Sequence, residues 1–264
     1  RDTGWIQIFT ENGQEVFDNV LCAFRIAEDA KVLLPVMVHL DGFHLSHMIE
    51  PILIEEQADV DKFLPPFKFP LALDPKKPVT MGAFAPPIIF SEAKKAQEVN
   101  LQASKEVIIE CWTEFAKAFG RKYSPVESYR AEGAKTLLMT MGSYSETAMD
   151  TIDKMRAEGK DVGLVRLRLW RPFPTDELRQ AVKDADILIV FDRALSTGGQ
   201  AGPVCSEVRS ALYNQDKKPR VTNIIGGLGG RDVTVAGFEE IINRGVKLAQ
   251  KGSQPEFEMF GVRE

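Results

Sequence analysis

The sequence predicts an α/β protein with a mostly parallel β-sheet covered by helices on both faces. Two observations carry this prediction. From residue 136 onward, short apolar runs alternate with amphipathic helical patterns. Near the beginning, a helical pattern over residues 11–28 leads through a short turn into the near-continuous apolar run Leu33–Leu40. Such a run is typical of a strand that is buried in a parallel sheet.

The first predicted unit is a helix followed by a strand. Apolar residues keep near-helical spacing between Glu11 and Glu28, and Asn12 marks the start of the helix. After a short turn, the chain continues as a strand over residues 32–40, which ends at Asp41-Gly42 because glycine tolerates angles that a strand residue does not. One such unit cannot bury a sheet, so we expect the rest of this region to lie upstream of Arg1.

Residues 50–87 form a proline-rich strap that also carries several phenylalanines. Proline fixes its own backbone angle and restricts the residue before it, so this segment is extended. A loose linker would not carry so many aromatic side chains. We therefore expect an ordered strap packed on its own protein or on a partner, and we favour the first alternative. A long helix should follow over Ser91–Arg121, with Ser91 as its N-cap and Gly120 at its C-terminal end.

The remainder of the chain predicts a complete α/β region. Strands are expected at Thr136–Met141, Val162–Leu169, Ile187–Phe191 and Val221–Ile225. Helices are expected at residues 145–158, from Thr175 onward, at 204–213 and at 238–251. We expect Thr175 to cap its helix, with Asp176 and Glu177 in the first turn, where the helix dipole favours negative charge.

The composition argues against several classes of function. The 264 residues carry a formal net charge of −5 with scattered lysines and arginines, which gives no basis for binding nucleic acid or an anionic membrane surface. No apolar run approaches the roughly 20 residues that span a bilayer. Cys22, Cys111 and Cys205 are far apart, so we expect buried free thiols in a reducing cytosol and neither a zinc nor an iron–sulfur site.

The turn after the first strand is the first candidate site. Asp41, Ser46 and the histidines His44 and His47 gather there, at the strand end where open α/β sheets bind ligands. Their spacing fits neither a zinc site nor a nucleophile elbow. The group therefore either lines a substrate channel or shapes the turn by hydrogen bonding.

Two glycine-rich loops and one arginine are further candidates. Gly198 and Gly199 could bind an anion through backbone amides, or form a tight turn that admits another subunit. For Gly227 and Gly229, contact with a partner or ligand and a structural role both stay open. Arg171, framed by prolines, could bind a carboxylate of a ligand or pair with an acidic residue of its own protein.

Taken in order, these stretches resemble the alpha subunit of pyruvate:ferredoxin oxidoreductase, a family of 2-oxoacid:acceptor oxidoreductases. The matching residues are Arg1-Asp2-Thr3-Gly4-Trp5, Gln14-Glu15 with Asp18, Leu34-Pro35-Val36, Leu40-Asp41-Gly42-Phe43, Ser46-His47, Phe63-Leu64-Pro65-Pro66, Gly142-Ser143, Arg171-Pro172-Phe173-Pro174 and Gly226-Gly227-Leu228-Gly229-Gly230. They span nearly the whole chain. The Asp-Gly-Phe…Ser-His and Arg-Pro-Phe-Pro elements are together the most specific.

The resemblance implies a domain organisation and an activity. Residues 1–50 would be the C-terminal part of a thiamine-diphosphate pyrimidine-binding domain, residues 51–121 the strap and a connecting helix, and residues 122–264 a transketolase C-terminal-like domain. The implied reaction is oxidative decarboxylation of pyruvate, or a related 2-oxoacid, with coenzyme A to acyl-CoA, CO₂ and reduced ferredoxin. Thiamine diphosphate with Mg²⁺ and the [4Fe-4S] clusters would be held mainly by beta, gamma and ferredoxin-like delta subunits.

The resemblance transfers no catalytic residue to this chain, because the family's activating glutamate and main substrate-binding residues would lie upstream of Arg1. The residues left as substrate-channel or interface candidates are Asp41, Gly42, Phe43, Ser46, His47, Arg171, Gly198, Gly199, Gly227 and Gly229. An oxalate oxidoreductase subunit shares the architecture and is one alternative. A non-catalytic assembly or binding module is another, and a transketolase-like enzyme without iron–sulfur partners is a third.

Overall fold

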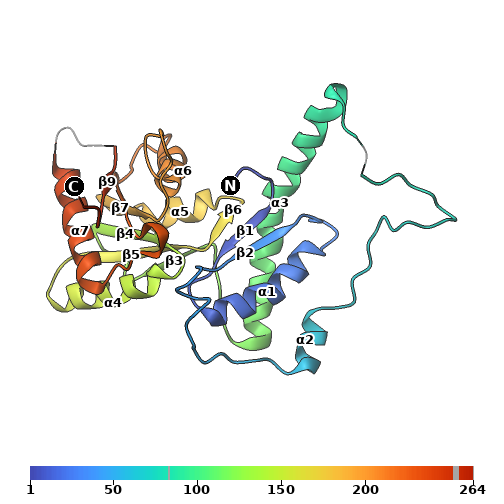
Figure 1. The fold of residues 1–264 in the computed structure, drawn as a ribbon, viewed down its shortest axis with the longest axis horizontal. Coiled ribbons are helices and arrows are strands. Elements are labelled where there is room, and N and C mark those ends of the chain that lie inside the picture. The colour runs from blue at the N-terminus through green and yellow to red at the C-terminus, as the bar shows by residue number, and fades with distance from the viewer. Residues whose placement is uncertain (83, 252–255, 264) are drawn as a thin grey trace.

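A computed structural model describes residues 1–82, 84–251 and 256–263 of the chain. These residues form two β-sheets. Figure 1 shows one sheet in each of two lobes. The smaller sheet belongs to the N-terminal lobe and consists of β1 (Ile6–Phe9), β2 (Val36–His39) and β6 (Leu169–Arg171), in the order β2-β1-β6. Strands β1 and β2 are parallel, and β6 pairs with β1 in the antiparallel direction. The smaller sheet therefore contains a strand from the C-terminal half of the chain.

The larger sheet, in the C-terminal lobe, is mostly parallel and has the order β3-β5-β4-β7-β8-β9. Its strands are β3 (Val126–Tyr129), β4 (Thr136–Met141), β5 (Val162–Leu167), β7 (Ile187–Asp192), β8 (Arg220–Ile225) and β9 (Glu258–Met259), of which β3 alone runs antiparallel to its neighbour. From β4 the chain continues to β5 on one side and then crosses to β7 on the other. The carboxyl ends of β4 and β7 therefore form a topological switch point, where open α/β sheets bind their ligands.

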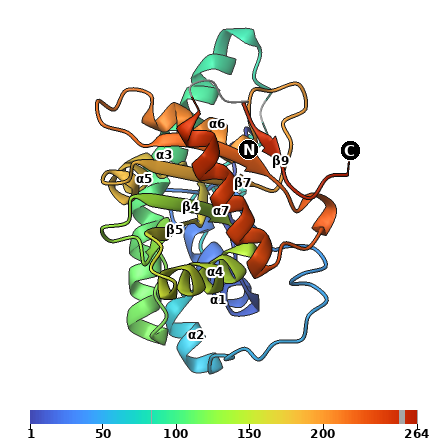
Figure 2. The same cartoon turned by 90° about the vertical axis from the view of Figure 1, so that its left-hand side faces the viewer.

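Helices cover both faces of the larger sheet. Helices α4 (Tyr144–Ala157) and α7 (Val235–Gln250) lie together on one face, which Figure 2 shows from the front. Helices α5 (Thr175–Val182) and α6 (Pro203–Leu212) lie on the other. Each face has its own buried apolar core, centred on residues such as Val190 and Leu178 on the α5/α6 side and Ile189 and Ile241 on the α4/α7 side. Burial on both faces explains why these strands are apolar throughout.

The N-terminal lobe has a third core, between the smaller sheet and two helices. Helix α1 (Gly13–Ala27) begins at Asn12, whose side chain accepts a hydrogen bond from the Glu15 amide at 2.9 Å. Helix α3 (Pro87–Phe119) supplies the fully buried Trp112 and Phe115, and the short helix α2 (Gln57–Phe63) packs Phe63 against them. Gly120 ends α3 in the left-handed conformation that glycine favours.

Four predictions from the sequence are wrong in detail. Strand β2 is a half-buried edge strand, because within the described residues it pairs only with β1. Helix α3 begins at Pro87 and not at Ser91, since proline is well suited to the first helical position. Thr175 is the first residue of α5 and makes no capping bond, and Pro174 occupies the N-cap. The strap packs on its own protein only at its beginning, where Phe63 is buried against α3, and none of the residues from Pro65 to Gly82 is buried.

Other predictions are confirmed and some elements were missed. The main strands of the larger sheet and the helices that follow them lie where expected, within a few residues. Cys22, Cys111 and Cys205 are all buried and free. The sequence analysis missed β1, β3, β9 and α2, and it placed Leu169 in the Val162–Leu169 strand, whereas β5 ends at Leu167 and Leu169 begins β6 of the smaller sheet. In the part of the chain that the structure describes, no helix combines the length and apolar character needed to cross a membrane.

Candidate functional site

The turn after β2 reaches across from the N-terminal lobe into the switch point of the larger sheet. Asp41 accepts a hydrogen bond from the Ser143 amide at 2.9 Å and another from the Ser143 hydroxyl. On its other side, Asp41 Oδ1 lies 2.5 Å from Arg193 Nη1. Ser143 follows β4 and Arg193 follows β7, so one carboxylate joins the two strand ends that flank the switch point.

The electrostatics of Asp41 follow from these contacts. Burial by itself raises the pKa of a carboxyl group. For Asp41 the hydrogen bond from Ser143 and the positive charge of Arg193 outweigh burial, so the pKa of Asp41 is lowered below its usual range. Asp41 is therefore ionised at neutral pH, and it forms an ion pair that is about four-fifths shielded from solvent on both sides.

Tyr144 extends the contact toward the glycine-rich loop after β8. The Arg193 guanidinium lies 4.0 Å from the centre of the Tyr144 ring, as in a cation–π contact, and the Tyr144 hydroxyl donates to the Arg231 carbonyl at 2.5 Å. His44 packs edge-on against the same ring and places Nε2 3.2 Å from the Gly230 carbonyl. The β2 turn is therefore locked to three loops of the larger sheet.

A cleft of about 520 Å³ opens beside this contact, between the two lobes. Its apolar walls include Phe9, Trp170 and Phe191, and its polar groups include His39 and Arg193. The His39 ring stacks on Phe9 with centroids 4.3 Å apart, and its buried Nε2 has no hydrogen-bond partner among the described residues. Because burial lowers the pKa of His39, this imidazole is neutral at pH 7 and can donate or accept one hydrogen bond.

The structure brings together only some of the residues predicted for the site. Asp41 lies in the contact, and Gly227 and Gly229 line the cleft. Gly42 is exposed, and so are Phe43, Ser46 and His47, whose mutual contacts shape the outer turn: the Phe43 amide donates to Ser46 Oγ at 2.9 Å, and Ser46 Oγ lies 2.8 Å from His47 Nδ1.

The other predicted residues lie outside the cleft. Gly198 and Gly199 are exposed on the loop between β7 and α6, where the Gly199 amide closes a turn onto the Ser196 carbonyl. Arg171 pairs with Glu207 of its own chain at 3.0 Å, the second of the two alternatives for this residue. The functional roles of all ten residues stay predictions.

Close approach explains why glycine occupies position 227. A Cβ atom there would lie 2.5 Å from Cε2 of the Tyr144 ring, and the residue has a φ of +69°. Gly229, in the same loop, has a φ of +64° but faces open space. Both positions therefore require a positive φ, and only position 227 also lacks room for a side chain.

We expect Gly227→Ala to lower the free energy of unfolding by about 2 kcal/mol and Gly229→Ala by about 1 kcal/mol, the cost of a left-handed non-glycine residue. Chemical denaturation of both variants measures the difference. Equal losses would show that the Tyr144 ring yields freely to the added methyl group.

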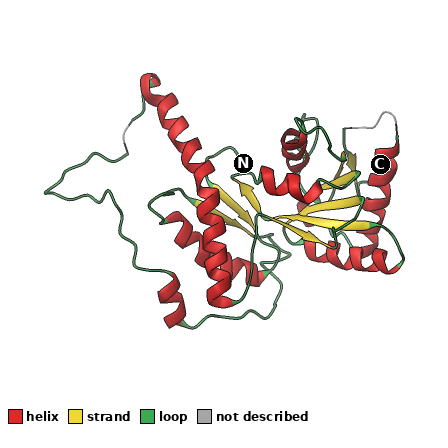
Figure 3. Ribbon diagram, turned by 180° about the vertical axis from the view of Figure 1, so that it is seen from behind, coloured by secondary structure: helices red, strands yellow, loops and turns green. Residues whose placement is uncertain are grey.

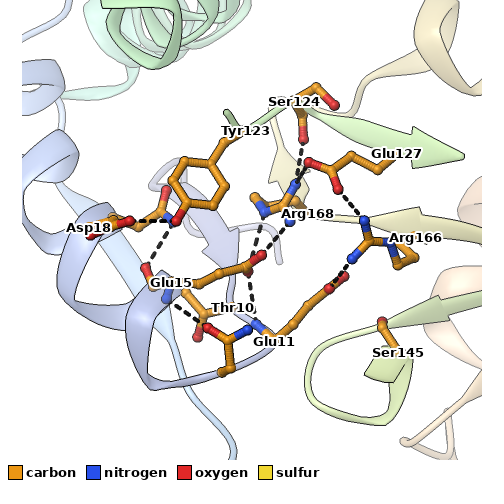
Figure 4. A network of polar contacts seen from close by, with 12 residues as sticks. Thr10, Glu11, Glu15, Asp18, Tyr123, Ser124, Glu127, Ser145, Arg166 and Arg168 are labelled. Carbon is orange, nitrogen blue, oxygen red and sulfur yellow. Dashed lines mark hydrogen bonds and ion pairs between the residues drawn. The ribbon is translucent and has the colours of Figure 1, made fainter. Parts of the chain in front are cut away.

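A second set of contacts, shown in Figure 4, was missed by the sequence reasoning. Arg168 is 1% exposed and lies between Glu15 of α1 and Glu127 of β3, to both of which it is ion-paired. Its neighbour Arg166 pairs with Glu127 and with Glu11, the residue that follows β1 by two positions. This buried network joins the lobes on the side away from the glycine-rich loops. The sequence contained a sign of this network, since Arg166 and Arg168 occupy alternate positions of an otherwise apolar strand. Buried cations require acidic partners, so such a pair predicts buried carboxylates nearby.

Within the network, Glu11 is the group most sensitive to pH. Burial, together with the negative charge of Glu15, raises the pKa of Glu11 to about 7 against the opposing charges of Arg168 and Arg166. The stabilisation that comes with a protonated Glu11 is therefore fully present below pH 4.5, the ordinary pKa of the group, and is lost as the pH rises through about 7.

We expect Glu11→Gln to abolish that loss, which amounts to up to about 3 kcal/mol. The measurement is the free energy of unfolding at pH 5.5 and at pH 8, with the surface variant Glu132→Gln as control. Parallel pH profiles for wild type and Glu11→Gln would contradict the assignment.

The fold defines a two-lobed α/β protein with a cleft at the switch point of its larger sheet. Residues 1–112 match the family model described as pyruvate flavodoxin/ferredoxin oxidoreductase, thiamine diphosphate-binding, and residues 134–238 match pyruvate:ferredoxin oxidoreductase core domain II. The chain belongs to the pyruvate:ferredoxin oxidoreductase family, as the resemblance of its motifs indicated.

Individual relatives agree with this assignment. Pyruvate synthase subunit PorA of Methanothermobacter thermautotrophicus is 43% identical over 92% of the chain, and ketoisovalerate oxidoreductase subunit VorA of Pyrococcus abyssi is 38% identical over 96%. The chain spans 62% and 64% of the length of these relatives. A solved 2-oxoglutarate:ferredoxin oxidoreductase from Magnetococcus marinus, 17% identical, matches 93% of this chain and 42% of its own with a TM-score of 0.57, and so supports the fold.

Proposed function

We propose that the chain is part of an alpha-type subunit of a thiamine-diphosphate-dependent 2-oxoacid:ferredoxin oxidoreductase. Such an enzyme decarboxylates pyruvate or a related 2-oxoacid oxidatively, joins the acyl group to coenzyme A and passes the electrons to ferredoxin. The observation that carries the proposal is the insertion of Asp41 between Ser143 and Arg193 beside an interlobe cleft, in a chain of this family. The buried free cysteines suit a cytoplasmic enzyme.

The cleft suits one wall of a cofactor or substrate channel better than a complete active site. Thiamine diphosphate, when bound, supplies the stabilisation of the carbanion, and the protein supplies binding and orientation. Phe9 and Trp170 offer apolar surface, and the neutral His39 offers a single hydrogen-bonding nitrogen. In a pocket of this kind the apolar walls exclude water, and the few polar groups orient the ligand.

Among the described residues, none form a set that suits a metal-containing group. Over residues 1–82, 84–251 and 256–263, no group of three or more His, Cys, Asp or Glu side chains is placed to hold a metal ion. We therefore assign Mg²⁺ and the [4Fe-4S] clusters, like the diphosphate and coenzyme A, mainly to the beta, gamma and ferredoxin-like delta subunits. Electron transfer to ferredoxin then takes place outside this chain.

We propose pyruvate as the substrate, and other 2-oxoacids are the alternatives to be tested. Pyruvate synthase subunits are 37–43% identical to the chain, while the ketoisovalerate relative is 38% identical. The overlap of these values means that the identity alone does not separate the two substrates. A purified complex that contains the chain should be assayed for coenzyme A-dependent reduction of ferredoxin with pyruvate, 2-oxoisovalerate, 2-oxoglutarate and oxalate.

We expect pyruvate to support the highest turnover. Absence of turnover with every 2-oxoacid would contradict the proposed function and favour an assembly module.

The role of the cleft is tested separately by Ala194→Trp, which fills the cleft from an exposed position on its rim. We expect at least about a tenfold loss of turnover for this variant, and none for Thr197→Trp, an exposed position on the same loop that does not line the cleft. Equal activity of the two variants would remove the cleft from the channel.

A further inference from the structure

A long arm extends from the N-terminal lobe and lies beside that lobe only at its two ends, near Arg25 and near Gly4. The arm comprises the strap from Leu64 and the first turns of α3, up to Asn100, and Figures 1 and 3 show it reaching far from both sheets. Among the residues described from Pro65 to Asn100, none is buried. The arm is therefore the part of the chain that depends least on its own core.

The side chains of the arm are those of an interface. Its exposed apolar residues are Phe67, Phe69, Leu71, Leu73, Val79, Met81, Phe84, Ile88, Ile89, Phe90 and Val99. Phe84 and Ile88 are 85% and 83% exposed. Soluble monomers rarely leave this much contiguous apolar surface in water, and a helix without tertiary contacts is only marginally stable. Burial against another molecule would remove the apolar surface from water and would stabilise the exposed first turns of the helix.

The arm is firmly held at its base and charged at its tip. Phe63 is buried at the base, and Arg25 Nη1 donates to its carbonyl at 2.7 Å. At the tip, Asp74 closes a turn by accepting from the Lys76 amide at 2.8 Å and the Lys77 amide at 2.9 Å. Between residues 64 and 86 there are three lysines and one aspartate, so the strap is basic although the whole chain has a net charge of −5.

A complementary surface lies on the C-terminal half of α3. A shallow groove of about 410 Å³ there is lined by Glu106, Glu110 and Glu114, which recur at every fourth residue and so share one helix face. The half-exposed Ile109 lies in the same groove. Glu114 is paired with Arg25, whereas Glu106 and Glu110 form no ion pair with any described residue. Lys117 also lines the groove, so the groove has a net negative charge around an apolar centre.

We propose that the arm of one chain docks on this acidic groove of a second copy of the same chain, and that the second copy returns its own arm to the first. Each copy carries both halves of the contact, so the exchange closes as a two-fold dimer, the commonest symmetry of oligomers. Lys76 and Lys77 would face Glu106 and Glu110. The arm leads away from its own lobe, so the partner groove is that of another molecule.

The first test asks which molecule the arm touches. Complexes assembled from an equal mixture of isotopically light and heavy chains are treated with a carbodiimide, which joins lysine to carboxylate at contact distance. We expect mixed light–heavy peptides that link Lys76 or Lys77 to Glu106 or Glu110. Links within one isotope only, or links from these lysines to a different polypeptide of the complex, would overturn the proposal.

The second test exchanges the charges. Lys76→Glu with Lys77→Glu should weaken self-association about tenfold, as loss of two exposed ion pairs predicts, and so should Glu106→Lys with Glu110→Lys. A mixture of these two double variants should associate more tightly than either alone. Lys217→Glu with Lys218→Glu makes the same charge change on a distant loop and should have no effect. Equal weakening in this control, or no recovery in the mixture, would overturn the proposal.

Discussion

Arg168→Ala is expected to lower the free energy of unfolding by about 4 kcal/mol. The substitution leaves Glu15 and Glu127 without the cation that lies between them, and removal of one partner from a buried ion pair costs about 3–5 kcal/mol. The Arg168 guanidinium also donates to the Ser124 carbonyl at 3.1 Å, a partly buried acceptor that loses this donor in the alanine variant. Because these partners lie on α1, on β3 and just ahead of β3, the loss falls on the contact between the two lobes.

Chemical denaturation measures the change, and Arg244→Ala is a matched control. Arg244 also pairs with two carboxylates, Glu240 and Glu258, but it is 38% exposed and so should cost less than about 1 kcal/mol. If Arg168→Ala does not fold, Arg168→Lys can be measured in its place. Lysine keeps the positive charge, so this variant should lose less free energy of unfolding. Similar losses for Arg168→Ala and Arg244→Ala would mean that the network adds no more than a surface ion pair.

The larger sheet is the part of the fold that the sequence predicts best. Its strands are buried on both faces, so each one is a short apolar run bounded by glycine or polar residues, as at Thr136–Met141. Local chemistry also predicts the start of α1 at Asn12, since the cap uses an oxygen only three residues from its donor. These features depend on neighbours in the sequence.

The parts that were missed depend on distant residues. Strand β6 is apolar like the end of β5, and only its pairing with β1 assigns it to a different sheet. The strap looks like packed polypeptide because it carries aromatic residues, yet beyond Phe63 the side chains of Phe67, Phe69 and Phe84 lie exposed, which composition alone does not reveal. Composition indicates that such a segment must be buried, but not by which molecule.

The candidate site shows the same division. Asp41 stands out in the sequence, because it ends an apolar run beside a glycine. Its partners Ser143 and Arg193 lie more than a hundred residues away, and they meet it because the carboxyl ends of β4 and β7 flank the switch point. Ser143 was singled out only through the family resemblance, and Arg193 was not singled out as a site residue.

Asp41→Ala should harm folding and assembly more than substrate affinity. Without the carboxylate, Arg193 is left partly buried and unpaired, and the Ser143 amide and hydroxyl lose their acceptor. Together these losses amount to about 3 kcal/mol. Because the pKa of Asp41 is lowered in the folded protein, the stabilisation is present at neutral pH and is lost as the pH falls through that lowered pKa.

The measurements are thermal or chemical unfolding of the variant, together with KM and kcat of the complex that contains it. Asp161→Ala is the matched control, because Asp161 also accepts from an amide, that of Lys135 at 3.0 Å, and faces an arginine, but within one lobe and 52% exposed. A cycle of Asp41→Ala, Arg193→Ala and the double variant should give a coupling energy of about 1–3 kcal/mol. Normal unfolding with a large rise in KM would instead place Asp41 in direct contact with the substrate.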